Sequence, residues 1–171
     1  EGLDLYANED AVISLTGYSW PVKEKLPETF FLRGTYCWGW ATWKRGWELF
    51  NADGRKLMHE LEARKLTGLF DFNNSHFYTQ MLKDQVEGRN DSWALRWYAS
   101  AFLENKLTLL PARSLVQNIG IDGSGVHSGK SNEWTVNISS TPIQMRRIPI
   151  EDNLIARRAV TNFFLSMKRN S

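Results

Sequence analysis

The sequence predicts an α/β fold of three layers, in which a small mixed sheet is flanked by helices. Two apolar runs, residues 12–16 and 107–110, consist mainly of β-branched and leucine side chains and are typical of buried strands. Between them, apolar residues recur at intervals of three and four positions, which is the period of a helix packed against a core. Strands that alternate with helices along a chain indicate helices packed on the faces of a sheet.

The first fifty residues contain the first strand and a tryptophan-rich segment. The stretch "LDLYAN" is typical of a last helical turn, and "NED" turns the chain into the strand. A loop with two prolines follows. Residues 38–50 begin extended and become helical near Thr42, because Trp43, Trp47 and Phe50 recur at helical spacing. We therefore predict that Trp43 and Trp47 face a core.

Three further helices separate this segment from the next strand. We predict that the second begins after an Asn74/Ser75 cap and that the third opens with Asp91. Pro111 ends the strand "KLTLLP", and residues 114–120, "SLVQNIG", are predicted to form another strand. Residues 151–169 are predicted to form a last helix, because acidic residues stand at the start of this stretch and basic residues at its end. The predicted helices cover residues 55–66, 75–88, 91–106 and 151–169.

The composition indicates one globular domain over residues 1–171 and argues against several classes of partner. The chain has 21 basic and 19 acidic residues, and its net charge of +2 is too small for a dedicated nucleic-acid-binding protein. Its single cysteine, Cys37, excludes an internal disulfide and favours a reducing compartment, so we expect a cytoplasmic location. No apolar run approaches the roughly 18 to 20 residues of a membrane span.

Four tryptophans lie within ten positions, Trp38, Trp40, Trp43 and Trp47, with Gly39 between the first two. Indole faces in a concave site bury the C–H faces of a sugar ring, while polar neighbours bind its hydroxyl groups. If this stretch is extended, Trp38 and Trp40 share one face, and Gly39 lets a ligand approach the backbone. The alternative interpretation is that these tryptophans fill a core.

The stretch "GRNDSWALRW" places Asp91 at the predicted start of a helix, with Arg89 beside it. A carboxylate at this position can cap the helix by accepting hydrogen bonds from its backbone N–H groups. A carboxylate held at the boundary of an element can also act as a general base toward a substrate hydroxyl. The spacing alone leaves both interpretations open.

The stretch "SLVQNIGIDGSGVHSG" surrounds His127 with glycines. Such a turn can present backbone N–H groups to an anion, and an imidazole within it can bind a divalent metal. Only one further ligand candidate, Asp122, lies nearby, so a metal site does not follow from this chain alone. His59 and His76 lie in helical patterns without a suitably spaced partner, and we interpret both as structural.

The order of these three features resembles the second half of a glycosyltransferase of the GT-A fold, close to the large inverting family 2 type. The resemblance covers about residues 11–128, and residues 151–171 would form a C-terminal helical extension. It implies a partial GT-A domain in which residues 34–43 lie across the donor and acceptor sites. The substrate-binding residues that it implies are Tyr36, Trp38, Gly39 and Trp40.

The resemblance also implies the chemistry of the site. The acidic motif of the family, x-Glu-Asp, corresponds to residues 89–91 with Asn90 in place of Glu, so Asp91 would be the catalytic base. The late histidine of the family, a metal or diphosphate contact, corresponds to His127. The Asp-x-Asp motif that holds the cation and the nucleotide has no counterpart here. We therefore expect an N-terminal half outside this sequence to hold most of a Mg²⁺ or Mn²⁺ site, and the isolated chain to be inactive.

The implied partners are a nucleotide-sugar donor and a saccharide or lipid-linked acceptor. Two other classes of function stay open. A non-catalytic carbohydrate-binding module would use the aromatic wall without Asp91 and His127. A module that docks on a partner or on the inner face of a membrane would use the basic and apolar last helix. An exposed sheet edge would also allow a homodimer.

Overall fold

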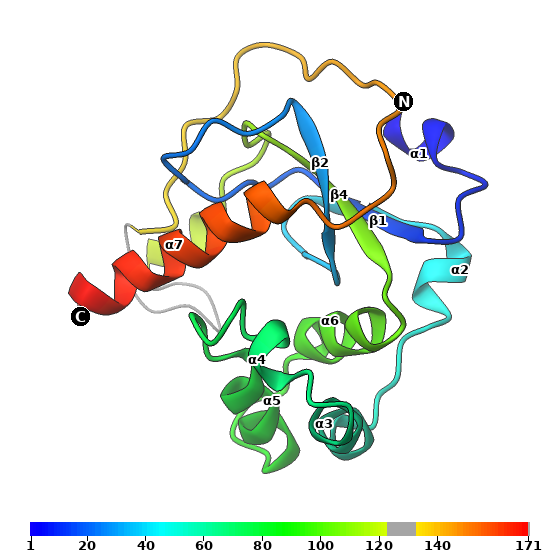
Figure 1. Cartoon of the computed structure of the whole chain (residues 1–171), viewed down its shortest axis with the longest axis vertical. Coiled ribbons are helices and arrows are strands. Elements are labelled where there is room, and N and C mark those ends of the chain that lie inside the picture. Colours follow the sequence, from blue (N-terminus) through cyan, green and yellow to red (C-terminus); the bar gives the residue numbers. More distant parts are fainter. Residues whose placement is uncertain (123–132, 171) are drawn as a thin grey trace.

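The computed structural model describes residues 1–122 and 133–170. It contains a small four-stranded mixed sheet and several helices, so the predicted mixed α/β class is confirmed (Figure 1). Two of the strands that the sequence predicts, at 12–16 and 107–110, are present. In chain order the elements are α1 (Gly2–Leu5), β1 (Val12–Thr16), β2 (Thr29–Arg33), β3 (Trp40–Thr42), α2 (Lys44–Trp47), α3 (Gly54–Ala63), α4 (Thr67–Phe70), α5 (Tyr78–Val86), α6 (Trp93–Leu103), β4 (Leu107–Pro111), the 3-10 turn η1 (Ile119–Asp122) and α7 (Leu154–Asn170).

The sheet has the strand order β2-β4-β1-β3. The central strands β1 and β4 are parallel, and β2 and β3 pair antiparallel at the two edges. Both edges of the sheet offer little backbone for pairing with another strand. β3 has only three residues. On β2, Phe31 forms a bridge to Asp152, and its carbonyl accepts the backbone N–H of Asn153 over 2.9 Å. The β2 edge is thus partly paired by the chain itself, which leaves less of it for pairing with a second copy of the chain.

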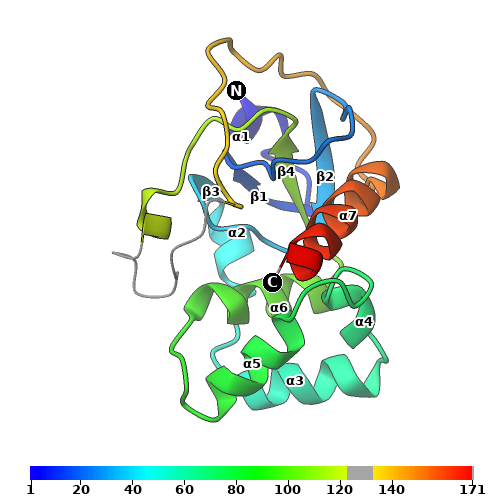
Figure 2. The same cartoon turned by 90° about the vertical axis from the view of Figure 1, so that its left-hand side faces the viewer.

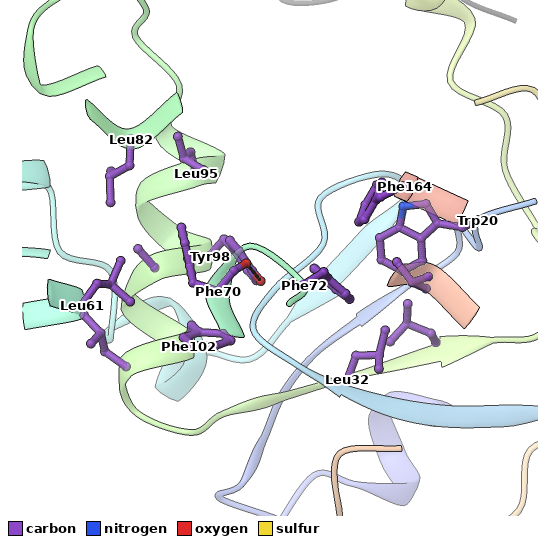
Figure 3. Close-up of a cluster of buried hydrophobic side chains, with 14 of the residues drawn as sticks. Trp20, Leu32, Leu61, Phe70, Phe72, Leu82, Leu95, Tyr98, Phe102 and Phe164 are labelled. Carbon is purple, nitrogen blue, oxygen red and sulfur yellow. Dashed lines mark hydrogen bonds between the residues drawn. The ribbon is translucent and has the colours of Figure 1, made fainter. Parts of the chain in front are cut away.

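One face of the sheet packs on a large hydrophobic core. Phe30, Leu32 and Leu110 point into it and meet side chains of α3, α5, α6 and α7. Figure 2 shows α3, α4, α5 and α6 grouped at one end of the molecule, while α7 runs past the sheet. Trp20, Leu32, Phe72 and Phe164 lie together in one part of this core, and Leu61, Phe70, Tyr98 and Phe102 lie together in another (Figure 3).

The other face of the sheet packs on a smaller core. Phe31 and Leu109, which alternate with the residues of the large core, contact Tyr6 and the extended segment 145–150 there. The Tyr6 hydroxyl donates to the Arg146 carbonyl over 3.4 Å and accepts the Ile148 N–H over 3.1 Å. The layer on this side is therefore a one-turn helix and an extended segment, where the sequence predicted flanking helices.

Two strand assignments differ from the prediction. The sequence assigned residues 29–33 to a loop, but they form β2, and four of its five residues are buried. Residues 114–120, predicted to be a strand, do not form one. The backbone N–H of Leu115 donates to the carbonyl of Gly17 over 2.7 Å, and the chain then enters the single turn η1.

The predicted cap at Asn74/Ser75 is also wrong. Phe72, Asn73 and Asn74 have φ angles of 48°, 57° and 61°, so the chain makes a left-handed turn at this point. The Ser75 hydroxyl donates back to the Phe72 carbonyl over 2.6 Å instead of capping a helix. Helix α5 begins later, at Tyr78.

Candidate functional site

Gly39 divides the tryptophan-rich segment into two parts. Its φ of +58° is left-handed, and a Cβ there would lie 2.6 Å from Cγ1 of Val116. Its carbonyl accepts the backbone N–H of Gly17 over 2.7 Å. The segment is therefore not extended through Gly39, and the condition under which Trp38 and Trp40 share one face is not met. The two side chains join different aromatic groups.

Trp38 and Tyr36 belong to the large core. The Trp38 ring packs edge-on against Tyr18, with 4.5 Å between centroids, and against Trp134 at 5.7 Å. Tyr36 packs edge-on against Trp20 at 5.0 Å. Its hydroxyl donates to the Arg33 carbonyl over 3.0 Å, and burial raises its pKa well above the ordinary value. Both rings are half-buried by protein side chains. Their contact with substrate stays a prediction.

Trp40 belongs to a second group, which lies at the surface. Its ring centroid is 6.2 Å from that of Trp47 and 5.7 Å from that of Trp93, and these two are 5.8 Å apart. Trp47 is 43% exposed and Trp93 is 41% exposed. We call Trp40, Trp47 and Trp93 the indole platform. Beneath it, the fully buried ring of Trp97 lies 4.7 Å from Trp40 and 5.4 Å from Trp47.

The exposure of Trp47 contradicts the prediction that it faces a core. Helix α2 is one turn long, so helical spacing does not place Trp43 and Trp47 on one buried face. Gly46, in the same turn, lies so close to β1 that a Cβ would stand 2.6 Å from the Ile13 carbonyl. Trp43 does pack against the small core, as predicted, and the Arg45 guanidinium covers its ring at 4.2 Å.

Asp91 is exposed and directly precedes the N-cap of α6. That cap is Ser92, whose hydroxyl accepts the Leu95 N–H over 3.4 Å, so the prediction that the helix opens with Asp91 is wrong by two residues. Asn90 fixes the turn, because its side-chain oxygen accepts the Ser92 N–H over 3.1 Å and its amide donates to the Met81 carbonyl over 3.0 Å. Asp91 therefore stands two positions before the platform residue Trp93.

Arg89, which precedes this turn, forms ion pairs with Asp84 and Glu87. All three side chains are exposed in part, so these pairs contribute little to stability. They hold the Arg89 guanidinium against the end of α5.

His127, the predicted metal contact, lies outside the described residues. Of the other histidines, His59 is exposed on α3. The His76 ring stacks on Phe164, with 4.3 Å between centroids, and lies edge-on to Tyr78 at 4.3 Å. Burial, together with the charge of Lys168, lowers its pKa to about 4, so it is a neutral core histidine at pH 7. Its predicted structural role agrees with these contacts.

A divalent cation finds no ready site in residues 1–122 and 133–170. They contain no group of three or more His, Cys, Asp or Glu side chains that could hold a metal ion. The donors present here therefore do not fit a resident Mg²⁺ or Mn²⁺.

A cleft of about 680 Å³ lies away from the predicted site residues, between the start of β2 and the segment 141–148. Two of its charged groups form an ion pair, since Arg113 donates to Glu28 over 2.7 Å, and the Gln144 N–H donates to the same carboxylate over 3.2 Å. The residues that line it are Pro27, Glu28, Thr29, Arg113, Thr141, Pro142, Gln144, Arg146 and Ile148.

No known protein family, curated protein or solved structure matches this chain. Among the helices that the structure describes, none combines the length and the apolar character needed to cross a membrane. The features that bear on function are therefore the indole platform and the turn that carries Asp91.

Two members of the indole platform, Trp47 and Trp93, were not predicted from the sequence as site residues. The spacing of Trp93, four residues before the fully buried Trp97, predicts a shared helix face. The structure shows that this face is buried only from Trp97 onward.

Proposed function

We propose that this chain is the acceptor-side portion of an inverting glycosyltransferase of the GT-A fold. The complete enzyme would transfer a sugar from a nucleotide-diphosphate donor to an acceptor hydroxyl. One observation carries the proposal: Asp91, an exposed carboxylate, stands two residues before Trp93 of the indole platform. A glycosyltransferase needs a surface for sugar rings beside a group that takes a proton, and this end of α6 offers both.

In the proposed reaction, Asp91 accepts the proton of the acceptor hydroxyl as its oxygen forms a bond to the anomeric carbon of the donor. The bond from that carbon to the diphosphate oxygen breaks, and the nucleotide diphosphate leaves as an anion. Attack opposite the leaving group inverts the anomeric carbon. The turn that Asn90 fixes would hold the carboxylate in position, which reduces the entropic part of the barrier.

The proposal assigns donor binding largely to residues outside this chain. Tyr36, Trp38, Gly39 and Trp40 are proposed to contact substrate, and His127 to contact the metal or the diphosphate. A Mg²⁺ or Mn²⁺ would neutralise the leaving diphosphate. The residues described here do not assemble a site for it, so no step of the proposed mechanism depends on a cation held by them.

The test is the turnover of the full-length enzyme with Asp91→Asn. Asparagine keeps the size of the side chain but cannot act as the base, so turnover should fall by roughly 10² to 10⁴ while the donor KM changes little. Asp53→Asn is the matched control. Asp53 is also an exposed carboxylate at the start of a helix, where it accepts the Lys56 N–H over 3.0 Å, but it lies on α3. Turnover of the Asp91→Asn enzyme within about threefold of the unmutated value would remove Asp91 from the catalytic role.

A carbohydrate-binding module is the first alternative, because the platform alone could bind sugars. It predicts saccharide binding that survives Asp91→Asn, with no transfer from any nucleotide sugar tested. Transfer that is lost in this variant excludes it.

Membrane or partner docking is the second alternative, and exposed apolar residues on α7 favour it. Leu154 is 75% exposed and Ile155 is 55% exposed, next to the exposed Arg158. Deleting the helix is a poor test, because Val160 and Phe164 on its other face belong to the large core. Leu154→Ser with Ile155→Ser leaves that face intact. If this alternative holds, sedimentation with vesicles containing anionic lipid should fall in the double variant.

A further inference from the structure

The two exposed members of the indole platform come from separate parts of the chain. Trp47 ends α2, whereas Trp93 begins α6, and Trp40 at the start of β3 lies against both. Trp47 and Trp93 are the tryptophans that are more than one third exposed among the described residues. Exposed indoles cost free energy in water, so two of them gathered on one surface indicate a binding role.

The side chains that make up this surface are aromatic. Phe50 adds a further aromatic ring, which stacks on one face of Trp47 with 5.1 Å between centroids and an interplanar angle of 3°. Exposed aliphatic side chains are also present among the described residues, at Leu115, Ile119, Leu154 and Ile155 among others. A surface that docks a protein or a lipid mixes aromatic and aliphatic side chains, whereas flat aromatic faces alone suit the C–H face of a pyranose ring.

The rim of the platform is polar and nearly balanced in charge. Lys44 and Glu48 form an exposed pair on α2, with 3.6 Å between Nζ and Oε1. The Arg96 guanidinium lies 5.8 Å from the centre of the Phe50 ring and donates to the Ala52 carbonyl over 3.1 Å. Asp91 adds a carboxylate at the α6 end. Such a rim offers donors and acceptors to hydroxyl groups and, within the described residues, lacks the positive charge that an anionic membrane or a nucleotide diphosphate requires.

We propose that the indole platform binds a pyranose ring of the acceptor, so that the acceptor is a saccharide or the sugar part of a glycolipid. This inference rests on the proposed function, in which Asp91, two residues before Trp93 of the platform, takes the proton of the acceptor. Trp47 and Trp93 are thereby assigned as acceptor-binding residues. Tyr36 and Trp38 pack against the large core in another aromatic group, so they are not members of the platform.

The test compares Trp47→Leu and Trp93→Leu in the full-length enzyme. Leucine keeps an apolar side chain but removes the flat face. Each variant should raise the KM for a saccharide acceptor by about 3- to 10-fold and leave the donor KM within about twofold, the scale of one aromatic contact. Trp93→Phe should recover part of the loss. Phe77→Leu is the matched control, since Phe77 is a 58% exposed aromatic residue on another surface, where Lys168 lies 4.1 Å from its ring centre.

A measurement of sugar binding in the absence of turnover distinguishes the platform assignment from the proposed function. Saturation-transfer NMR with methyl pyranosides and short oligosaccharides should show sugar C–H contacts that both leucine variants weaken. If no transfer occurs but this binding is found, the platform is a sugar-binding surface without an acceptor role, and the proposed function fails. If transfer occurs only onto acceptors without a sugar, or the acceptor KM is unchanged in both variants, the platform assignment fails and the proposed function stands. A change from dimer to monomer in the variants, with acceptor KM unchanged, would also overturn the platform assignment, because it would show that the platform is a protein interface.

Discussion

Arg157 and Asp152 form an ion pair that joins the last helix to the sheet. The Nε–H of Arg157 donates to Oδ2 of Asp152 over 2.6 Å, and Oδ1 of the same carboxylate accepts the backbone N–H of Arg33 over 3.1 Å. Arg157 is only 4% exposed, and its guanidinium lies 5.0 Å from the centre of the Phe72 ring. One side chain of α7 therefore connects the edge of β2 with the large core.

Replacing Arg157 should destabilise the fold strongly. Arg157→Leu leaves the Asp152 carboxylate without its buried partner, which costs roughly 3 kcal/mol. The adjacent Arg158 is exposed, so Arg158→Leu should change the free energy of unfolding by less than about 0.5 kcal/mol. Urea unfolding of both variants gives the comparison. Equal stabilities would mean that the buried pair contributes nothing.

Gly39→Ala should cost more than the left-handed backbone alone explains. A non-glycine residue at positive φ costs about 1 kcal/mol, and at Gly39 the new Cβ also meets Val116 at 2.6 Å. Gly88 separates the two effects, because it has a φ of +76° and a Cβ added there would meet no described atom within 4 Å. We expect a loss of about 1 kcal/mol for Gly88→Ala and at least twice that for Gly39→Ala in thermal unfolding. A smaller loss at Gly39 would contradict the close contact with Val116.

His76 should make the protein less stable in mild acid. Its pKa is about 4 in the folded protein and near 6.5 when unfolded, so the unfolded chain binds more protons between these values. The contribution of His76 to stability is complete above about pH 6.5, falls as the pH is lowered toward 4, and amounts to at most about 3 kcal/mol. His76→Phe, which can keep the stack on Phe164, should flatten the pH dependence of unfolding in this window. His59→Phe on the exposed side of α3 should leave it unchanged.

Cys37 should be unreactive in the folded protein. Burial raises the pKa of its thiol to about 12, which reduces the reactive thiolate at pH 8 by about 10³-fold. Labelling with a disulfide reagent should therefore be slow in buffer and fast in concentrated urea. Rapid labelling of the folded protein, at the rate of the unfolded chain, would show that the thiol reaches solvent.

The strands that could be predicted from the sequence are those apolar enough to be buried in any tertiary arrangement. β1 and β4 are apolar runs at the centre of the sheet, and their composition is sufficient to predict them. β2 is equally apolar, but it follows a loop with two prolines, which are typical of irregular structure. The start of α6 was misplaced because Asp91 and Ser92 are both good caps, and only the observed hydrogen bond decides between them.

The candidate site was predictable in part. The tryptophan-rich segment and Asp91 stand out in the sequence, and both lie near one end of α6. The division of the tryptophans between core and surface was not predictable, since it depends on the backbone turn at Gly39 and on the one-turn length of α2. Trp93 is exposed while Trp97 is buried on the same helix, and tertiary packing alone sets that boundary.

The small core has a consequence for synthesis on the ribosome. Tyr6 donates a hydrogen bond to a carbonyl 140 positions further along the chain, so the cover on one face of the sheet is incomplete until residues 145–150 have left the exit tunnel. During that interval the nascent chain presents Phe31 and Leu109 to its surroundings on adjacent strands. A chain cut short before this segment would leave that apolar face partly exposed and would also lack α7, which contributes Val160 and Phe164 to the large core, so it should recruit chaperones or aggregate.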